Sequence, residues 1–261
     1  MTRPPARRLL VCASALCLAG APSLTACSPG GPDRTAPSAS ATAGRSAPAA
    51  SPSPSAGTAL TSAQAEAALI TPADLGEPWA PTQGAATWRD TLLKATADSP
   101  DCGRLLEAVY TEDLFGPRNP VRAVAGLDDG MDEAQLRYQV IAHDPADVDR
   151  TLAWLRSLPQ KCGRFTAATA GGAVQGGQVT EAALPPVGDA REGLRITLAG
   201  ENADGEPTAL TLDLAAVRVG DDAIVLTNGG LGNVSQEVTA AVVQLGTQRL
   251  TEVRRQARLE V

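Results

Sequence analysis

The sequence feature that most constrains this chain is the tetrapeptide Leu24-Thr25-Ala26-Cys27, because it separates a removable leader from the part that can fold. Three arginines near the N-terminus precede an apolar run over residues 9–20. This run is shorter than the roughly 20 apolar residues of a membrane-spanning helix and is typical of a signal peptide. Leucine at −3, small residues at −2 and −1 and a cysteine at +1 form a lipobox, the pattern that marks a cysteine for attachment of diacylglycerol. We therefore expect residues 1–26 to be a lipoprotein signal peptide and Cys27 to be lipidated.

Lipidation would hold the mature chain at a membrane without a spanning helix. Two acyl chains anchor a protein stably, whereas a single chain is marginal. The expected location is the extracellular face of the cell membrane, with the lipid anchor as the membrane contact. An alternative is an ordinary secretory signal cut near Ala26, with Cys27 incidental. The Arg7-Arg8 pair leaves the export route open between the general and the twin-arginine pathways.

The composition of the segment that follows the lipobox predicts a tether. Residues 28–57 consist mainly of Ser, Ala, Pro, Gly and Thr and contain no aliphatic side chain larger than Ala. Such a segment buries too little apolar area to offset the entropy of ordering it, so we expect residues 27–57 to be a lipidated cysteine plus a disordered tether. As a flexible coil the tether would span roughly 30 Å. The folded domain is then expected over residues 58–261.

The pattern within residues 58–261 predicts an α+β fold. Helix starts with Thr, Ser or Asp as the cap, followed by Pro or a capping-box Gln, predict helices over 61–69, 71–76, 99–110 and from 144 to about 158, and a last helix begins near 235. Alternating apolar residues predict strands over 122–127, 135–140, 174–183, 193–199, 209–219 and 223–227. Short hairpin connections indicate an antiparallel β-sheet with helices packed on one face. Residues 229–233, Gly-Gly-Leu-Gly-Asn, are expected to form a flexible turn before the last helix, with an anion-binding loop as the alternative.

The charge of the chain disfavours nucleic acid as a partner. The formal net charge is −7, and removal of the three leader arginines would lower it to −10. An acidic surface repels a phosphate backbone and anionic lipid. Only Lys94 and Lys161 among the 22 basic residues are lysines, and Ala, Gly and Pro are abundant, which is typical of a GC-rich and specifically an actinobacterial genome.

Two cysteines remain after the leader and Cys27, namely Cys102 and Cys162. In an exported protein, a remaining pair usually forms a disulfide. One residue lies near the start of a predicted helix and the other just after the end of the next, so a bridge would clamp both helices. Two separate free thiols are the alternative. A zinc site is disfavoured because two cysteines and one histidine do not fill its coordination shell.

Several short motifs resemble the PknH-like extracellular sensor domains, which occur on receptor Ser/Thr kinases and on stand-alone actinobacterial lipoproteins. The motifs are residues 67–76 with Trp79, residues 102–106, and Trp154-Leu155 with residues 158–162. The resemblance covers most of residues 60–255. It implies an antiparallel sheet flanked by helices, a cleft for a small ligand and no catalysis. The chain departs from the kinase-linked domains in having no cysteine beyond Cys162, where they carry a second disulfide.

No constellation of catalytic residues stands out, and we expect no enzyme activity, no cofactor and no metal. His143 is the only histidine and precedes a helix start, and no nucleophile-elbow pattern surrounds a serine. All seven aromatic residues lie before residue 166. Trp79 and Trp88 are candidates to line a ligand cleft, although filling a core is the alternative role for both. The function expected is therefore a ligand-binding or sensor module, whose partner is an unknown small molecule or envelope protein. The alternatives are an envelope scaffold, a lipid carrier or a hydrolase.

Overall fold

The computed structural model describes residues 60–116, 121–131, 133–202 and 205–259. Residues 1–26 and 27–57, with the predicted lipidation site Cys27, lie outside the described residues. In the described part, no helix is both long and apolar enough to cross a membrane. The elements in chain order are α1 (Ser62–Ala67), α2 (Pro72–Leu75), β1 (Trp79–Pro81), η1 (Arg89–Leu93), β2 (Ala95–Ala97), α3 (Pro100–Tyr110), β3 (Val121–Asp129), β4 (Ala134–Ala142), α4 (Pro145–Lys161), β5 (Phe165–Thr169), β6 (Val174–Glu181), β7 (Ala190–Glu201), β8 (Pro207–Val219), β9 (Asp222–Leu231) and α5 (Gln236–Leu259).

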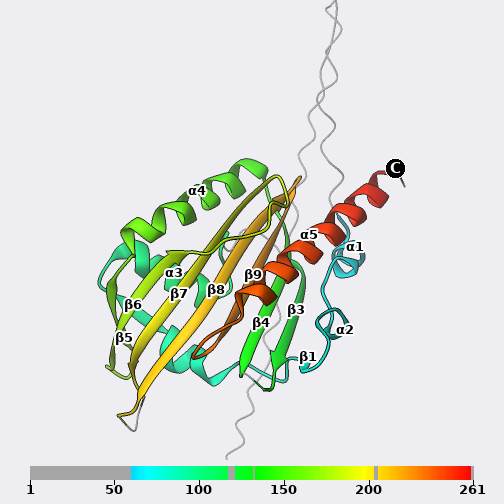
Figure 1. Ribbon diagram of the computed structural model, residues 1–261. Coiled ribbons are helices and arrows are strands. Elements are labelled where there is room, and N and C mark those ends of the chain that lie inside the picture. The colour runs from blue at the N-terminus through cyan, green and yellow to red at the C-terminus, as the bar shows by residue number, and fades with distance from the viewer. Residues whose placement is uncertain (1–59, 117–120, 132, 203–204, 260–261) are drawn as a thin grey trace, which may run out of the picture. The chain divides into compact units, whose positions relative to one another are not determined.

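A nine-stranded antiparallel sheet forms the centre of the fold (Figure 1). Its strand order is β1-β3-β4-β9-β8-β7-β6-β5-β2. Strands β5 to β9 form a meander, and β9 then pairs with β4, where Tyr138 lies opposite Leu226. Strand β8 pairs along its length with β7 and β9, so the longest strand lies near the middle of the sheet. The predicted α+β class with an antiparallel sheet is confirmed.

The helices cover both faces of the sheet, and the expectation that they pack on one face is wrong. Figure 1 shows α5 in front of the sheet and α3 behind it. The residues of β8 explain this arrangement. Leu210, Leu212 and Leu214 face the core formed with α3 and α4, whereas Ala215 and Val217 face the core formed with α1 and α5. Successive side chains of a strand point to opposite faces of the sheet. A strand that is apolar at consecutive positions therefore needs other elements packed on both faces.

The predicted helix starts are confirmed, and their caps show why these segments are helical. Thr61 and Gln64 form a reciprocal capping box at α1. At α2 the carboxylate of Asp74 accepts hydrogen bonds from the backbone nitrogen and the hydroxyl of Thr71, at 2.7 Å each. Asp144 accepts a hydrogen bond from the backbone nitrogen of Ala146 at 2.8 Å and so caps α4. These interactions lie within three residues of each cap, which is why the local sequence predicts them.

The predicted flexible turn over residues 229–233 is only partly present. Gly229, Gly230 and Leu231 belong to β9, and Gly232 alone has a positive φ, of 85°. The two glycines in the strand lie where neighbouring groups approach closely. A Cβ at Gly230 would lie 3.2 Å from the Cα of Ala134. The glycines therefore serve close packing across the sheet and not mobility.

Candidate ligand-binding cavity

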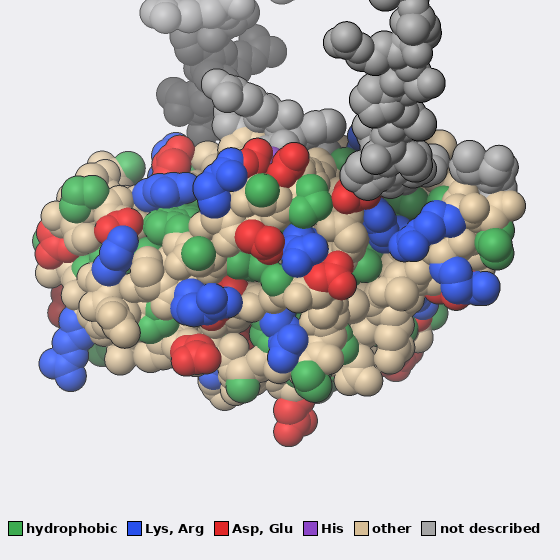
Figure 2. All heavy atoms as spheres, turned by 90° about the horizontal axis from the view of Figure 1, so that it is seen from above, with side chains coloured by type: hydrophobic (Ala, Val, Ile, Leu, Met, Phe, Trp, Pro, Cys, Tyr) green, Lys and Arg blue, Asp and Glu red, His purple; other side chains and the backbone are tan. Residues whose placement is uncertain are grey.

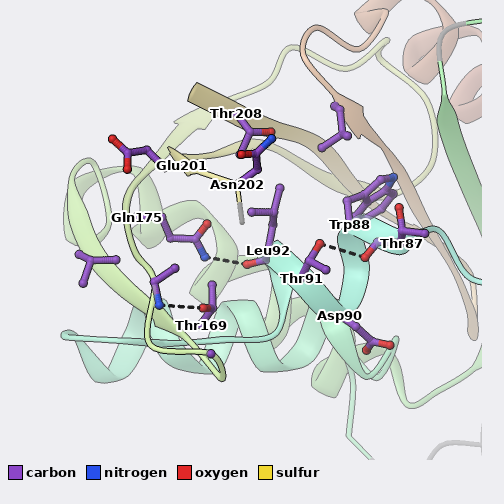
Figure 3. Close-up of a pocket in the computed structure, with 15 residues that line it drawn as sticks. Thr87, Trp88, Asp90, Thr91, Leu92, Thr169, Gln175, Glu201, Asn202 and Thr208 are labelled. Carbon is purple, nitrogen blue, oxygen red and sulfur yellow. Dashed lines mark hydrogen bonds between the residues drawn. The ribbon is translucent and has the colours of Figure 1, made fainter. Parts of the chain in front are cut away.

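A cavity of about 650 Å³ lies at one end of the sheet. The ends of the β5–β6 and β7–β8 hairpins meet η1 and the last residue of β9 there (Figure 3). Its size falls in the usual range of small-molecule sites, about 300–1,000 Å³. The lining residues are Thr87, Trp88, Asp90, Thr91, Leu92, Thr169, Gly171, Ala173, Val174, Gln175, Gly200, Glu201, Asn202, Thr208 and Leu231.

One wall of the cavity is the π-helical turn η1. Its backbone closes with the nitrogen of Lys94 donating to the carbonyl of Arg89 at 2.9 Å, an i to i+5 bond. The buried guanidinium of Arg89 fixes this turn to the end of α3 by donating to the carbonyl of Tyr110 at 2.8 Å and pairing with Glu112 at 3.1 Å. π-Helical turns are rare in proteins overall, but those that do occur are often found at functional sites. The turn brings Trp88, Thr91 and Leu92 to the cavity.

Trp88 forms the border between the cavity and the core. Its side chain is buried, and its ring lies against β9 at Gly229. A Cβ at Gly229 would lie 2.9 Å from the nearest ring carbon, so the glycine makes room for the indole. The indole Nε1 has no hydrogen-bond partner among the described residues, and in Figure 3 it lies on the side of the ring away from Gln175. Trp88 therefore presents an apolar surface to the cavity.

Gln175 is the most deeply buried polar residue in the lining, with 3% of its surface exposed. Its Nε2 donates to the backbone carbonyl of Leu92 at 2.7 Å. Its Oε1 is buried and has no hydrogen-bond partner among the described residues. Gln175 thus joins β6 to η1 through one buried hydrogen bond at the wall of the cavity.

The charges of the lining are acidic. Asp90 and Glu201 are its charged members, and none of the described lining residues is Lys or Arg. Asp90 accepts a hydrogen bond from the hydroxyl of Tyr110 at 2.8 Å, which holds its carboxylate at the border of the cavity. Among the described residues, no group of three or more His, Cys, Asp and Glu is placed to hold a metal ion.

The disulfide between Cys102 and Cys162 is present and joins α3 to α4 within the core. Polar contacts support the same junction. Lys161 pairs with Asp101 at 3.1 Å, and the indole Nε1 of Trp154 donates to Asp101 at 3.3 Å. The hydrogen bond from Lys161 lowers the pKa of Asp101. The disulfide thus belongs to the scaffold and not to the cavity.

The two tryptophans predicted to line a cleft are not brought together. Trp88 lines the cavity, whereas Trp79, in β1, packs against the core on the α5 side of the sheet. His143 lies away from the cavity and contacts the ring of Phe115 edge-on, at 5.2 Å between centroids. Gln175 was not predicted. In the structure Gln175 lies on the same inward side of β6 as Gly177 and Val179, but the sequence gives no such pattern, since the apolar Val174 lies on the exposed side.

Comparison with known proteins identifies no family for the chain. No protein-family model matches it, and no curated protein matches it. Among solved structures, the extracellular domain of PknH from Mycobacterium tuberculosis is similar with a TM-score of 0.44 and 14% identity, over 75% of this chain and 97% of that chain. A hypothetical protein from Helicobacter pylori is similar with a TM-score of 0.27 and 17% identity, over 46% of this chain and 83% of that chain.

Proposed function

We propose that this protein is a lipid-anchored, non-catalytic module that binds a small molecule in the cavity between η1 and the β5–β6 and β7–β8 hairpins. The observation that carries the proposal is the cavity itself. Its volume of about 650 Å³ and its mixture of apolar walls with a few convergent polar groups are typical of ligand sites. The rigid sheet and the anchored turn η1 hold these groups in place.

The face of the protein shown in Figure 2 does not favour a flat docking partner. On the face shown in Figure 2, basic and acidic side chains are interspersed, and hydrophobic side chains are scattered between them. Several charges are paired, for example Arg156 with Glu192 at 3.0 Å and Arg218 with Asp149 at 2.9 Å. Interspersed and paired charges are typical of a solvated surface.

The cavity can be tested by filling it. Thr91 is exposed and lines the cavity, so Thr91→Trp adds bulk there without entering the core. Leu259→Trp is the matched control, because Leu259 is 75% exposed at the end of α5. We expect a fragment library screened by ligand-observed NMR on the full-length protein to yield binders that Thr91→Trp abolishes and Leu259→Trp retains. A screen without binders, or binders that Thr91→Trp leaves unchanged, would overturn the proposal.

The anchor rests on the lipobox and on the disulfide, since disulfides persist mainly in oxidising compartments outside the cytosol. Cys27→Ala is expected to remove labelling by a radioactive fatty acid and either to release the chain or to leave it uncleaved. Cys17→Ala is the control, because Cys17 lies in the predicted leader. Normal labelling and membrane retention of Cys27→Ala would contradict the anchor.

A further inference from the structure

A second pocket, of about 500 Å³, lies beside η1 and is distinct from the cavity described above. Its lining includes residues 81–85 after β1, Arg89 of η1, Glu112 after α3, Gly126 of β3 and Arg137 of β4. We propose that this Arg137 pocket is a further binding site, which takes a small ligand with a single carboxylate group and holds that group on the terminal nitrogens of Arg137. The inference does not depend on what the cavity binds.

The guanidinium of Arg137 has hydrogen-bond donors that the protein does not use. A guanidinium carries five N–H donors, and within the described residues that of Arg137 makes no directed hydrogen bond. Its Nε lies 2.7 Å from Oε2 of Glu112, which is a charge contact without hydrogen-bond alignment. By contrast, Arg195 and Arg249, which are also partly exposed and ion-paired, each donate to their partner carboxylates.

A ligand can reach these donors. The Arg137 side chain is 37% exposed, although its Nε is buried, so the accessible part of the guanidinium is its terminal edge. Gly126 keeps space free beside this edge. A Cβ at Gly126 would lie 3.7 Å from Nη1 of Arg137 and 2.9 Å from the hydroxyl of Thr82, so a larger residue would crowd the pocket here. The planar terminal edge of a guanidinium matches a carboxylate through two parallel hydrogen bonds.

The charges of the lining favour an anion. Glu112 shares one carboxylate between two guanidinium groups, since its Oε1 lies 3.1 Å from Nη2 of Arg89 and its Oε2 contacts Arg137. The lining therefore carries two positive charges and one negative charge, and one carboxylate would neutralise the excess.

A neighbouring acidic group limits the charge that the ligand can carry. Asp128 accepts hydrogen bonds from Thr82 and Gln135, at 2.9 Å each, and does not line the pocket. No described ion pair joins it to Arg137. Its negative charge nevertheless weakens the attraction for a multiply charged anion such as phosphate. A ligand with a single negative charge is thus favoured over a dianion.

The conformation of Glu112 is a second sign that this arrangement is specific. Glu112 directly follows the C-terminal cap of α3 and has a φ of 58°, in the left-handed region that glycine or asparagine usually occupies after a helix. A glutamate here is unfavourable for the backbone, but its side chain joins Arg89 to Arg137. The strained residue thereby fixes the position of the Arg137 guanidinium before any ligand binds.

Three probes test the site: N-acetylglycine, N-acetylglycinamide and inorganic phosphate. The first two differ only in the replacement of a carboxylate by a neutral amide. Titrations of the full-length protein are followed by NMR, with the Arg137 Nε–H and the Gly126 backbone amide as reporters. We expect N-acetylglycine to bind at millimolar concentration and to shift both signals. N-Acetylglycinamide and phosphate should bind about tenfold more weakly or worse, because charge-assisted hydrogen bonds are lost or a second charge is repelled.

Arg137→Gln removes the cation and should weaken N-acetylglycine by about tenfold or more. Arg137→Lys keeps the charge without the fork and should weaken it by roughly threefold to fivefold. Arg156→Gln is the matched control, because Arg156 is ion-paired with Glu192 at 3.0 Å but does not line the pocket. It should leave the affinity unchanged.

The unmodified protein gives an answer even if the Arg137 variants do not fold. Unshifted Arg137 and Gly126 signals in a protein that binds N-acetylglycine would overturn the site, as would the absence of binding at millimolar concentration. Equal binding of the amide, or tighter binding of phosphate, would overturn the ligand class. Thr91→Trp should leave N-acetylglycine binding intact, since Thr91 lines the cavity and not this pocket. Loss of binding in that variant would place the carboxylate in the cavity instead and overturn the Arg137 pocket.

Discussion

A single glycine, Gly246, allows the last helix to pack closely on Tyr138. Tyr138 is fully buried on the α5 side of the sheet, and burial raises the pKa of its hydroxyl. Its ring lies directly beneath α5 at Gly246. A Cβ at Gly246 would lie 2.4 Å from the hydroxyl oxygen, closer than atoms approach in folded proteins. The glycine therefore allows α5 to approach the sheet closely.

Gly246→Ala is expected to lower the free energy of unfolding by about 1–2 kcal/mol. Overpacking of a core costs about 1–3 kcal/mol, and the better helix propensity of alanine, worth up to about 1 kcal/mol, offsets part of it. The measurement is urea unfolding followed by circular dichroism. Gly103→Ala, in α3, is the matched control, since a Cβ there meets no atom within 4 Å. Gly103→Ala should leave the free energy of unfolding unchanged or raise it. If Gly246→Ala instead proved more stable than the unmodified protein, α5 would not be closely packed on Tyr138.

At the scale of elements, α2 is joined to α5 by one charged contact. The guanidinium of Arg249 pairs with the carboxylate of Asp74 and also donates to the carbonyl of Leu69 at 2.7 Å. Burial alone would raise the pKa of Asp74, but the hydrogen bonds from Arg249 and Thr71 outweigh it and lower the pKa below its ordinary value. The charged form of Asp74 is therefore the one that stabilises the fold.

This contact predicts a pH dependence of stability. A carboxyl group whose pKa is lower in the folded state contributes stability above its ordinary pKa of 3.8 and loses it as the pH falls toward the folded value. Asp74→Asn should thus be less stable than the unmodified protein at pH 7, and the difference should shrink below about pH 4. Urea unfolding from pH 7 to pH 3 checks this. Glu66→Gln, at an exposed site on α1, is the control, and a difference that grows in acid would contradict the account.

Helices whose starts depend on neighbouring residues could be predicted from the sequence. Short strands that depend on pairing with distant segments could not. The capped starts of α1, α2 and α4 depend on side chains within three residues of the cap. Strands β1 and β2 have three residues each and exist only through pairing with β3 and β5. Their hydrogen bonds join segments distant in sequence, so no local pattern indicates them. The sequence likewise predicted the strand that contains Gln175, but not the cavity that this residue lines.

At the scale of the whole molecule, the Cys102–Cys162 disulfide reduces the number of conformations open to the unfolded chain. It closes a loop with a sequence separation of 60 residues, and both cysteines are completely buried. In the chain-entropy model a loop of this length stabilises the fold by roughly 4 kcal/mol. The bridge also ties α3 to α4, the two helices that cover the sheet on the cavity side.

Replacement of both cysteines by alanine should lower the free energy of unfolding by about 4 kcal/mol, within the range of about 2–5 kcal/mol seen when native disulfides are removed. Urea unfolding with and without reductant is the measurement. The double variant is its own control, because reductant should destabilise the unmodified protein and have no effect on the variant. Equal stability of the reduced and oxidised unmodified protein would show that the bridge contributes little.

The sequence by itself determined the antiparallel α+β class, the helix starts and the pairing of the two cysteines. Strand periodicity and helix capping depend on neighbouring residues, and the cysteine pairing follows from the number of cysteines. Tertiary structure alone decided that helices cover both faces, that Trp79 and Trp88 lie on opposite sides of the sheet, and that segments distant in sequence enclose one cavity. These facts depend on which segments distant in sequence pack together. The free energy of such packing is shared among many residues, so no single stretch of the chain carries it.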